Sequence, residues 1–422
     1  MVLAGSVPLP PLGDHELLLF WCQLLVLLFS ARLGGYALRL IGQPRVVGEL
    51  LAGMVLGPSV LGQVWPRGWE WLFPEDARQA GLLLGLAWFG IALLLVTTGA
   101  ETDLASIKRQ GRVVTTTAIG SLLVPFGAGV GVGWLLPKSF VGSSGTATFS
   151  VFIGVALAIS SLPVAARILS DLGLLNLPIG QLVLAVAMTN DVIGWILLGV
   201  LAGVAEDGSV SIGGVLIAVV GVVFVTVVTL TLGPRFLDQM LLAVGRREGG
   251  PAASLSIVVL FAVAVGAITH AIGLEVVIGA FLAGIAIGRS RLIDTSVREH
   301  LEITTAAVFA PLFFAVAGLR VDLTALADPS VVVGVVVVVV VATATKLLGS
   351  YAGARVGGLS RSDAFSVGAA LNARGALEVV VATVGLSIGV LNRSSYTAVV
   401  VMAIITSAST GPLLRIGGAK RT

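Results

Sequence analysis

The sequence predicts an all-α polytopic membrane protein with about thirteen transmembrane helices and an inverted structural repeat. The prediction depends on the composition, on the distribution of basic residues between loops, and on two repeated motifs. Of the 422 residues, 57% are hydrophobic and only 11% are charged, whereas a soluble domain carries about 25% charged residues. A chain of this composition is typical of a protein that spans the lipid bilayer many times.

Apolar windows separated by charged or Pro/Gly-rich breaks define the spans. The N-terminus lacks the basic region of a secretory signal, because Asp14 and Glu16 precede the first Lys or Arg, so the first span is expected to be retained. No long hydrophilic segment remains, and we expect a single transmembrane domain over 1–422 without a soluble regulatory domain. The predicted limits are 16–38, 44–61, 81–101, 112–136, 148–169, 178–204, 209–233, 252–272, 275–289, 303–320, 330–354, 362–390 and 394–416.

The basic residues follow this division of the chain. With the N-terminus outside, most Lys and Arg residues fall at cytoplasmic ends of the spans, as the positive-inside rule requires. We therefore expect a plasma-membrane protein with an outside N-terminus and a cytoplasmic C-terminus. Two basic residues, Lys346 and Arg374, lie inside spans, and those that fall outside the cell are Arg67, Arg78, Lys138, Arg320 and Arg393.

Two motifs recur in the same order in the two halves of the chain. GELLAGMVLG at 48–57 matches GAFLAGIAIG at 279–288, and TGAETDL at 98–104 matches AGLRVDL at 317–323. The second span thus pairs with the ninth and the third with the tenth, an odd offset that places the copies upside down relative to each other. The pattern predicts repeat halves of about 44–204 and 275–416, an architecture of secondary transporters with a binding site near the membrane midplane.

Several other classes of site are disfavoured. Cys22 is the only cysteine, which excludes a disulfide framework, and the wide separation of the three histidines in the sequence argues against a histidine metal site. The net charge of +3 is scattered over short loops, so no nucleic-acid partner is expected. No cofactor is expected either.

The sixth span contains the residue on which the functional prediction depends. Asn190 and Asp191 lie near the middle of an apolar run from 178 to 204, where a carboxylate costs roughly 2.5–3.5 kcal/mol on insertion scales. Such an acid normally faces a water-filled cavity or a partner inside the protein. Asp191 is therefore predicted to handle a cation or a proton; the alternative is a paired acid that only holds helices together.

The fifth span is interrupted by Ser160, Ser161 and Pro163. Proline removes a backbone donor and clashes with the preceding turn, so the helix either breaks near the midplane, where carbonyls can bind a cation, or only kinks. The sequence leaves both possibilities open. By the repeat offset the partner is the twelfth span, in which Arg374 and Glu378 are four residues apart and can form a structural ion pair if the helix is continuous.

Lys346 is the lysine inside the eleventh span. It can extend to the interface along its aliphatic stem, or it can meet Asp191 or the hydroxyls of the fifth span as a basic partner. An ammonium next to a carboxylate favours the charged form of both groups, while burial opposes it. Glu49, at the start of the second span, is predicted to be an interfacial or packing residue.

These motifs together resemble the cation:proton antiporter-2 family, which includes Kef-type and Nap-type antiporters and plant cation/proton exchangers. The resemblance covers about 15–416 and implies a thirteen-span fold, a core domain that moves against a dimerisation domain, a homodimer, and exchange of Na⁺ or K⁺ for H⁺. The segments that carry it are GELLAGMVLGPSVLG at 48–62, LLLVTTGAETDL at 93–104, TND at 189–191, PLFFAVAGLRVDL at 311–323 and LNARGALE at 371–378.

The resemblance also assigns roles to single residues. Asp191 matches the family's cation- and proton-binding aspartate, Asn190 the residue before it, and Lys346 the basic residue of the opposite repeat, while Ser160 and Ser161 fall in the first broken helix. An Asn-Asp pair goes with electroneutral exchange in the family, but the lysine is more typical of its Asp-Asp group, so the stoichiometry is not assigned. The chain ends at Thr422, and the nucleotide-sensing domain of Kef proteins is not expected.

The resulting hypothesis is alternating access with competition between a proton and a monovalent cation at Asp191. A proton-coupled exporter of an organic cation is the main alternative, although the seven tryptophans do not cluster along a route. An intramembrane hydrolase is disfavoured because no histidine lies in the middle of a span, and because only Glu49 or Glu378 could supply a second carboxylate. A channel is the remaining alternative, which carrier-like saturation of the flux would exclude.

Overall fold

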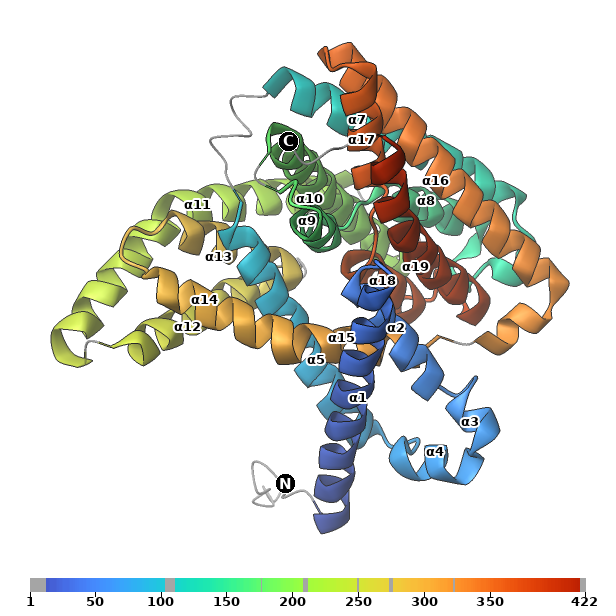
Figure 1. Ribbon diagram of the computed structural model, residues 1–422, viewed down its shortest axis with the longest axis horizontal. Helices are drawn as coiled ribbons and strands as arrows, with labels where there is room; N and C mark the ends of the chain where they lie inside the picture. The colour runs from blue at the N-terminus through green and yellow to red at the C-terminus, as the bar shows by residue number, and fades with distance from the viewer. Residues whose placement is uncertain are drawn as a thin grey trace.

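Long apolar helices build the whole fold (Figure 1). The structure is a computed structural model that describes residues 13–102, 111–175, 177–207, 212–248, 250–272, 276–321 and 323–417. Within these ranges the only pairing of extended backbone is an isolated bridge between Val141 and Leu391. Nine helices of the described part are long and apolar enough to cross a membrane. The all-α polytopic prediction is therefore confirmed.

The remaining predicted spans are short, broken or partly outside the described residues. The fifth and twelfth are each two half-helices, the ninth is the 14-residue α13 (Val276–Arg289), and the seventh is α11 (Ile212–Glu248). Some positions of the predicted topology, among them Asp103, Lys108, Arg109 and Asp322, lie outside the described residues. Two short helices, α3 (Leu61–Val64) and α4 (Pro66–Leu72), connect the second and third spans.

The helices group into two bundles by their contacts. Figure 1 shows α12, α13 and α14 on one side and α7, α8 and α16 on the other. The panel bundle consists of α1 (Asp14–Leu40), α2 (Arg45–Leu56), α5 (Ala77–Ala100), α12 (Pro251–Ala271), α13, α14 (Thr295–Thr304), the π-helix η2 (Thr305–Phe309) and α15 (Ala310–Leu319). The core bundle consists of α7 (Gly111–Leu135), α8 (Gly145–Ala158), α9 (Leu162–Asp171), α10 (Pro178–Asp207), α16 (Pro329–Gly357), α17 (Arg361–Leu371), α18 (Ala376–Ser387) and α19 (Arg393–Ile416). Helix α11 contacts α10 of the core bundle and α12 and α13 of the panel bundle, and so connects the two.

Glycines let α2 and α15 pack backbone to backbone in the panel bundle. A Cβ atom added at Gly53 would lie 2.0 Å from the carbonyl oxygen of Ala315, and one at Gly318 would lie 2.2 Å from that of Leu50. No side chain fits in such a space. Close approach through small residues is the usual way in which helices associate in lipid.

The same arrangement recurs between α5 and α13. A Cβ at Gly284 would lie 2.2 Å from the carbonyl oxygen of Val96, and one at Gly99 would lie 2.3 Å from that of Phe281. When the repeated motifs are aligned, these four residues match the four residues of the α2–α15 contact. The recurrence of each contact at its matching position agrees with the inverted repeat predicted from the sequence.

Both predicted core helices are broken at the point where they cross. Helix α8 ends at Ala158 and α9 begins at Leu162, so the fifth span breaks rather than kinks. Pro163 falls in the first turn of α9, where backbone N–H groups have no partner within the helix. In the twelfth span α17 ends at Leu371 and α18 begins at Ala376. The two breaks touch, because the backbone N–H of Ser161 donates to the carbonyl of Ala373 over 3.0 Å.

Candidate ion-binding site

The carbonyl end of half-helix α8 is bound by a buried lysine. Lys346, on α16, has no exposed surface. Its ammonium donates to the carbonyl of Ser121 over 3.0 Å and to the carbonyl of Ala158, the last residue of α8. A helix C-terminus carries unpaired carbonyls and a partial negative charge. The ammonium pairs one of these carbonyls and offsets the negative charge. Extension of Lys346 to the membrane interface is thus excluded.

Arg374 binds the same helix end from the second break. Its guanidinium donates to the carbonyls of Ala156 and Leu157 over 2.7 and 2.6 Å. Glu378 instead accepts the backbone N–H of Gly375 over 2.6 Å at the start of α18. Because α18 begins only at Ala376, Arg374 and Glu378 do not share one continuous helix, but their opposite charges still attract each other. Each side chain binds the end of a different half-helix.

Asp191 lies at the start of the other half-helix of the fifth span. Its carboxylate, which is 7% exposed, accepts a hydrogen bond from the backbone N–H of Leu162, the first residue of α9. A helix N-terminus favours negative charge because its first N–H groups are free. The neighbouring Asn190 donates to the hydroxyl of Ser121 over 2.8 Å. Ser121 of α7 therefore belongs to the same hydrogen-bond network, because Lys346 binds its backbone carbonyl.

Four oxygen atoms at the first break are buried without a hydrogen-bond partner. They are one carboxylate oxygen of Asp191, the amide oxygen of Asn190, and the hydroxyl oxygens of Ser160 and Ser161. Buried polar atoms are nearly always paired. A group of unpaired oxygens beside a broken helix matches the ligands that a dehydrated hard cation takes up. The residues present thus fit a monovalent cation that is cargo rather than a resident cofactor.

The structure brings together most of the residues that the sequence singled out. Asp191, Ser160 and Ser161 lie at the first break, and Lys346 and Arg374 both bind the end of α8 beside it. Sequence reasoning missed Ser121, whose only signal was a hydroxyl within an otherwise apolar part of the fourth span. Ser121 connects the two predicted partners, because Asn190 binds its side chain and Lys346 binds its backbone.

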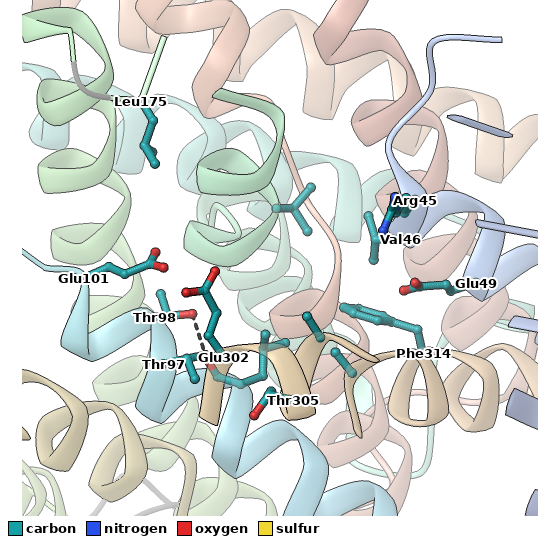
Figure 2. A pocket seen from close by; sticks show the side chains of 14 residues that line it. Arg45, Val46, Glu49, Thr97, Thr98, Glu101, Leu175, Glu302, Thr305 and Phe314 are labelled. Atoms are coloured by element: carbon teal, nitrogen blue, oxygen red, sulfur yellow. Dashed lines mark hydrogen bonds between the residues drawn. The ribbon is translucent and has the colours of Figure 1, made fainter. Parts of the chain in front are cut away.

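A cavity of about 170 Å³ opens between the two bundles (Figure 2). The core bundle contributes Val164 of α9, in the turn that follows the first break, and Leu175 contributes from the loop after α9. The panel bundle contributes the acidic residues Glu49, Glu101 and Glu302. Sequence reasoning treated Glu49 as an interfacial or packing residue and did not single out the other two. Glu101 stands within a repeated motif, which was the one available signal.

Two broken helices that cross inside an inverted repeat, a buried carboxylate at the crossing, and a cavity lined by Val164 just after the first break define a membrane carrier. Comparison with known proteins identifies its family. The family model "Sodium/hydrogen exchanger, transmembrane" matches residues 25–416. The chain belongs to the sodium/hydrogen exchanger family and is an antiporter of cations and protons, not an enzyme, which confirms the resemblance seen in the sequence.

Relatives of known function agree with this assignment. The Na(+)/H(+) antiporter NhaS4 of Synechocystis sp. is 31% identical over 405 residues, which cover 96% of this chain and 98% of the relative. Cation/H(+) antiporter 15 of Arabidopsis thaliana and K(+)/H(+) antiporter 1 of Saccharomyces cerevisiae are each 30% identical over 98% of this chain, which spans about half of their length. The sodium proton antiporter MjNhaP1 of Methanocaldococcus jannaschii has the same fold, with a TM-score of 0.69, 14% identity, and coverage of 96% and 99% of the two chains.

Proposed function

We propose that this protein exchanges Na⁺ or K⁺ for protons by alternating access, and that Asp191 is the site where the two ligands compete. The observation that carries the proposal is the set of unpaired buried oxygens on Asp191, Asn190, Ser160 and Ser161. A proton or a cation at Asp191 would neutralise a carboxylate that is costly to keep charged in this environment. The empty, ionised core is then the form that crosses the membrane barrier least readily, which couples the two fluxes.

The two basic residues supply the fixed part of this charge balance. Lys346 and Arg374 donate to carbonyls at the end of α8 and have no exposed surface. Their positive charges lower the free-energy cost of burying the carboxylate of Asp191. They do not bond its unpaired oxygen, which stays available to a ligand. An exchangeable ligand can therefore occupy Asp191 while the basic residues stay in place.

The cavity between the bundles supplies the route on one side. The basic residues of the loops favour an outside N-terminus and a cytoplasmic C-terminus in the plasma membrane, and in that orientation the cavity faces the cytoplasm. The relatives named above support either Na⁺ or K⁺ as the cation. A homodimer and contact with lipid are proposed on the exposed apolar face of α1, which includes Trp21, Leu25, Phe29 and Leu33.

Purified protein in proteoliposomes tests the proposal. An imposed gradient of Na⁺ or K⁺ should drive movement of protons, measured with an internal pH dye, and Asp191→Asn should abolish it. The matched control is Asp294→Asn, because Asp294 is exposed at the start of α14 and its side chain makes no capping hydrogen bond. Normal exchange in the Asp191 variant, or equal loss in the Asp294 variant, would contradict the assignment.

A comparison of Li⁺, Na⁺, K⁺ and Rb⁺ with and without a voltage clamp would then give the cation and the stoichiometry. Exchange that saturates with cation concentration is expected of a carrier. Flux that rises linearly and collapses an imposed voltage would indicate a channel and would overturn alternating access.

A further inference from the structure

The inverted repeat supplies a counterpart for the open cavity. A second cavity of only about 30 Å³ lies between α15, α5 and α18, where α15 and α18 are the repeat counterparts of α5 and α9. When the repeated motifs are aligned, its α15 wall matches the α5 wall of the open cavity position by position. The matched residues are Leu94 and Phe313, Thr97 and Val316, Thr98 and Ala317, and Glu101 and Arg320. The open cavity is thus several times larger than its narrow counterpart.

The two related cavities differ in charge at the end of this wall. The open cavity has the carboxylate of Glu101, whereas the narrow cavity has the guanidinium of Arg320 at the matching position. A cleft lined by one sign of charge raises the local concentration of oppositely charged ligands. Packing alone does not explain the exchange of sign, because both positions are exposed at the ends of their helices.

A second carboxylate faces Glu101 from α14. Figure 2 shows the side chains of Glu101 and Glu302 extending into the same part of the cavity. The hydroxyl of Thr305 lines the same cavity, is 1% exposed and has no hydrogen-bond partner. Thr305 begins the π-helix η2, and a π-helical turn of this kind is frequent at functional sites. The cavity wall therefore carries the facing carboxylates of Glu101 and Glu302 and one unsatisfied buried oxygen, that of Thr305.

We propose that Glu101 and Glu302 form a second site for a monovalent cation at the mouth of the open cavity. The site collects the cation before it reaches Asp191 and releases it when protons replace it. This inference rests on the proposed exchange at Asp191 and adds where the cation binds first. The matching Arg320 lowers the local cation concentration at the other mouth, so the two faces of the carrier differ in apparent affinity.

Protons compete at this mouth in the physiological range. The surrounding protein removes part of the hydration of Glu101, and the neighbouring Glu302 adds repulsion, so the pKa of Glu101 rises to about 7. Above that pH Glu101 is ionised, and below it Glu101 takes up a proton and the mouth loses negative charge. The other charged residues of the described part that face this pair are Arg45 and Glu49 of α2 and Arg298 of α14. Arg298 is committed to the carbonyls of Ile287, Gly288 and Ser290.

Exchange from each face of the membrane tests the proposal. In vesicles of known orientation, Glu101→Gln, Glu302→Gln and the double variant should raise the KM for Na⁺ or K⁺ on the cytoplasmic face about threefold to tenfold, with kcat unchanged. The KM on the outer face should stay at the wild-type value. The wild-type KM should also rise between pH 8 and pH 6, and Glu101→Gln should remove part of that rise. Glu101→Asp, which keeps the charge, should restore most of the affinity.

The matched control is Glu299→Gln, which removes the same charge from an exposed position on α14 that does not line the cavity. A wild-type cytoplasmic KM in the double variant, or an equal effect of Glu299→Gln, would overturn the mouth site and leave exchange at Asp191 intact. Absence of exchange in the wild-type protein would instead refute the proposed function.

A binding measurement separates the two sites without transport. In the Asp191→Asn background, NaCl or KCl should still raise the melting temperature of the detergent-solubilised protein relative to choline chloride. Addition of Glu101→Gln and Glu302→Gln should abolish that difference. A cation-dependent shift that persists in the triple variant would place the remaining site elsewhere and contradict the proposal.

Discussion

The two broken helices occupy matching places in the repeat, yet the free N–H and carbonyl groups at their breaks are bound by different kinds of residue. In the twelfth span the N–H of Gly375, the residue that precedes α18, is bound by Glu378, which lies in the first turn of that same helix. In the fifth span the first N–H of α9 is bound by Asp191, which comes from α10. A local cap forms with its helix and stays with it. A carboxylate from a different helix can leave the end of α9 without unfolding it, and so it can accept another ligand.

The carbonyl ends of the two breaks show the same division of roles. The end of α8 is bound by charged side chains from other spans, Lys346 and Arg374. Near the end of α17, Ser407 of α19 bonds the backbone of Arg374, and the side chain of Asn372 donates to Ser409 over 3.2 Å. The second break is thus fixed by neutral groups and by its own residues. The first break is instead held by charged side chains, which suits a site whose net charge changes when a proton or a cation binds or leaves.

The largest effect is expected where this balance is removed at the end of α8. Arg374→Met should destabilise the protein by about 3 kcal/mol or more, because the buried carbonyls of Ala156 and Leu157 lose charged donors and no water replaces them. The measurement is thermal unfolding in detergent together with the yield of monodisperse protein. Arg393→Met, at an exposed position on α19, should change little. Equal stability of the two variants would mean that Arg374 does not hold the break together.

Some of this architecture could be predicted from the sequence, and the rest could not, for physical reasons. Composition and loop charge predict the spans, because the bilayer imposes length and sidedness on each helix. The break after Ala158 was one of two outcomes compatible with Pro163. The break near Gly375 has no proline to mark it. The partners of Arg374 are carbonyls 218 and 217 residues away in the chain, and carbonyls leave no trace in a sequence.

The mouth of the cavity was also beyond sequence reasoning. Glu101 lies near the end of a span, where an acid is ordinary, and Glu302 lies in a separate charged segment. Only the packing of α5 against α14 and η2 places them in one cavity. In contrast, Asp191 was predicted because the cost of a carboxylate at midplane does not depend on knowledge of its neighbours.

A smaller effect is expected at the contact between the two breaks. A Cβ at Gly375 would lie 2.4 Å from Cγ2 of Val164 on α9, so Gly375→Ala should destabilise the protein by about 1–3 kcal/mol. Val164→Ala removes the opposing methyl groups, and the double variant should be more stable than the sum of the two single effects. Gly127→Ala is the control, because a Cβ at Gly127 of α7 meets open space and alanine favours a helix. Additive effects in this cycle of melting temperatures would show that the two breaks do not press on each other at this point.

The smallest change in stability should separate the two carboxylates most clearly. Glu378→Gln should lower the stability by about 1 kcal/mol, because an amide oxygen can still accept the N–H of Gly375 but loses its charge at the helix N-terminus. Exchange per folded molecule should persist in this variant. Asp191→Asn should abolish exchange and leave the melting temperature equal or higher, because it removes an incompletely paired buried charge. Parallel loss of stability and exchange in both variants would make the two acids equivalent caps, and the ligand exchange proposed for the first break would have no structural basis.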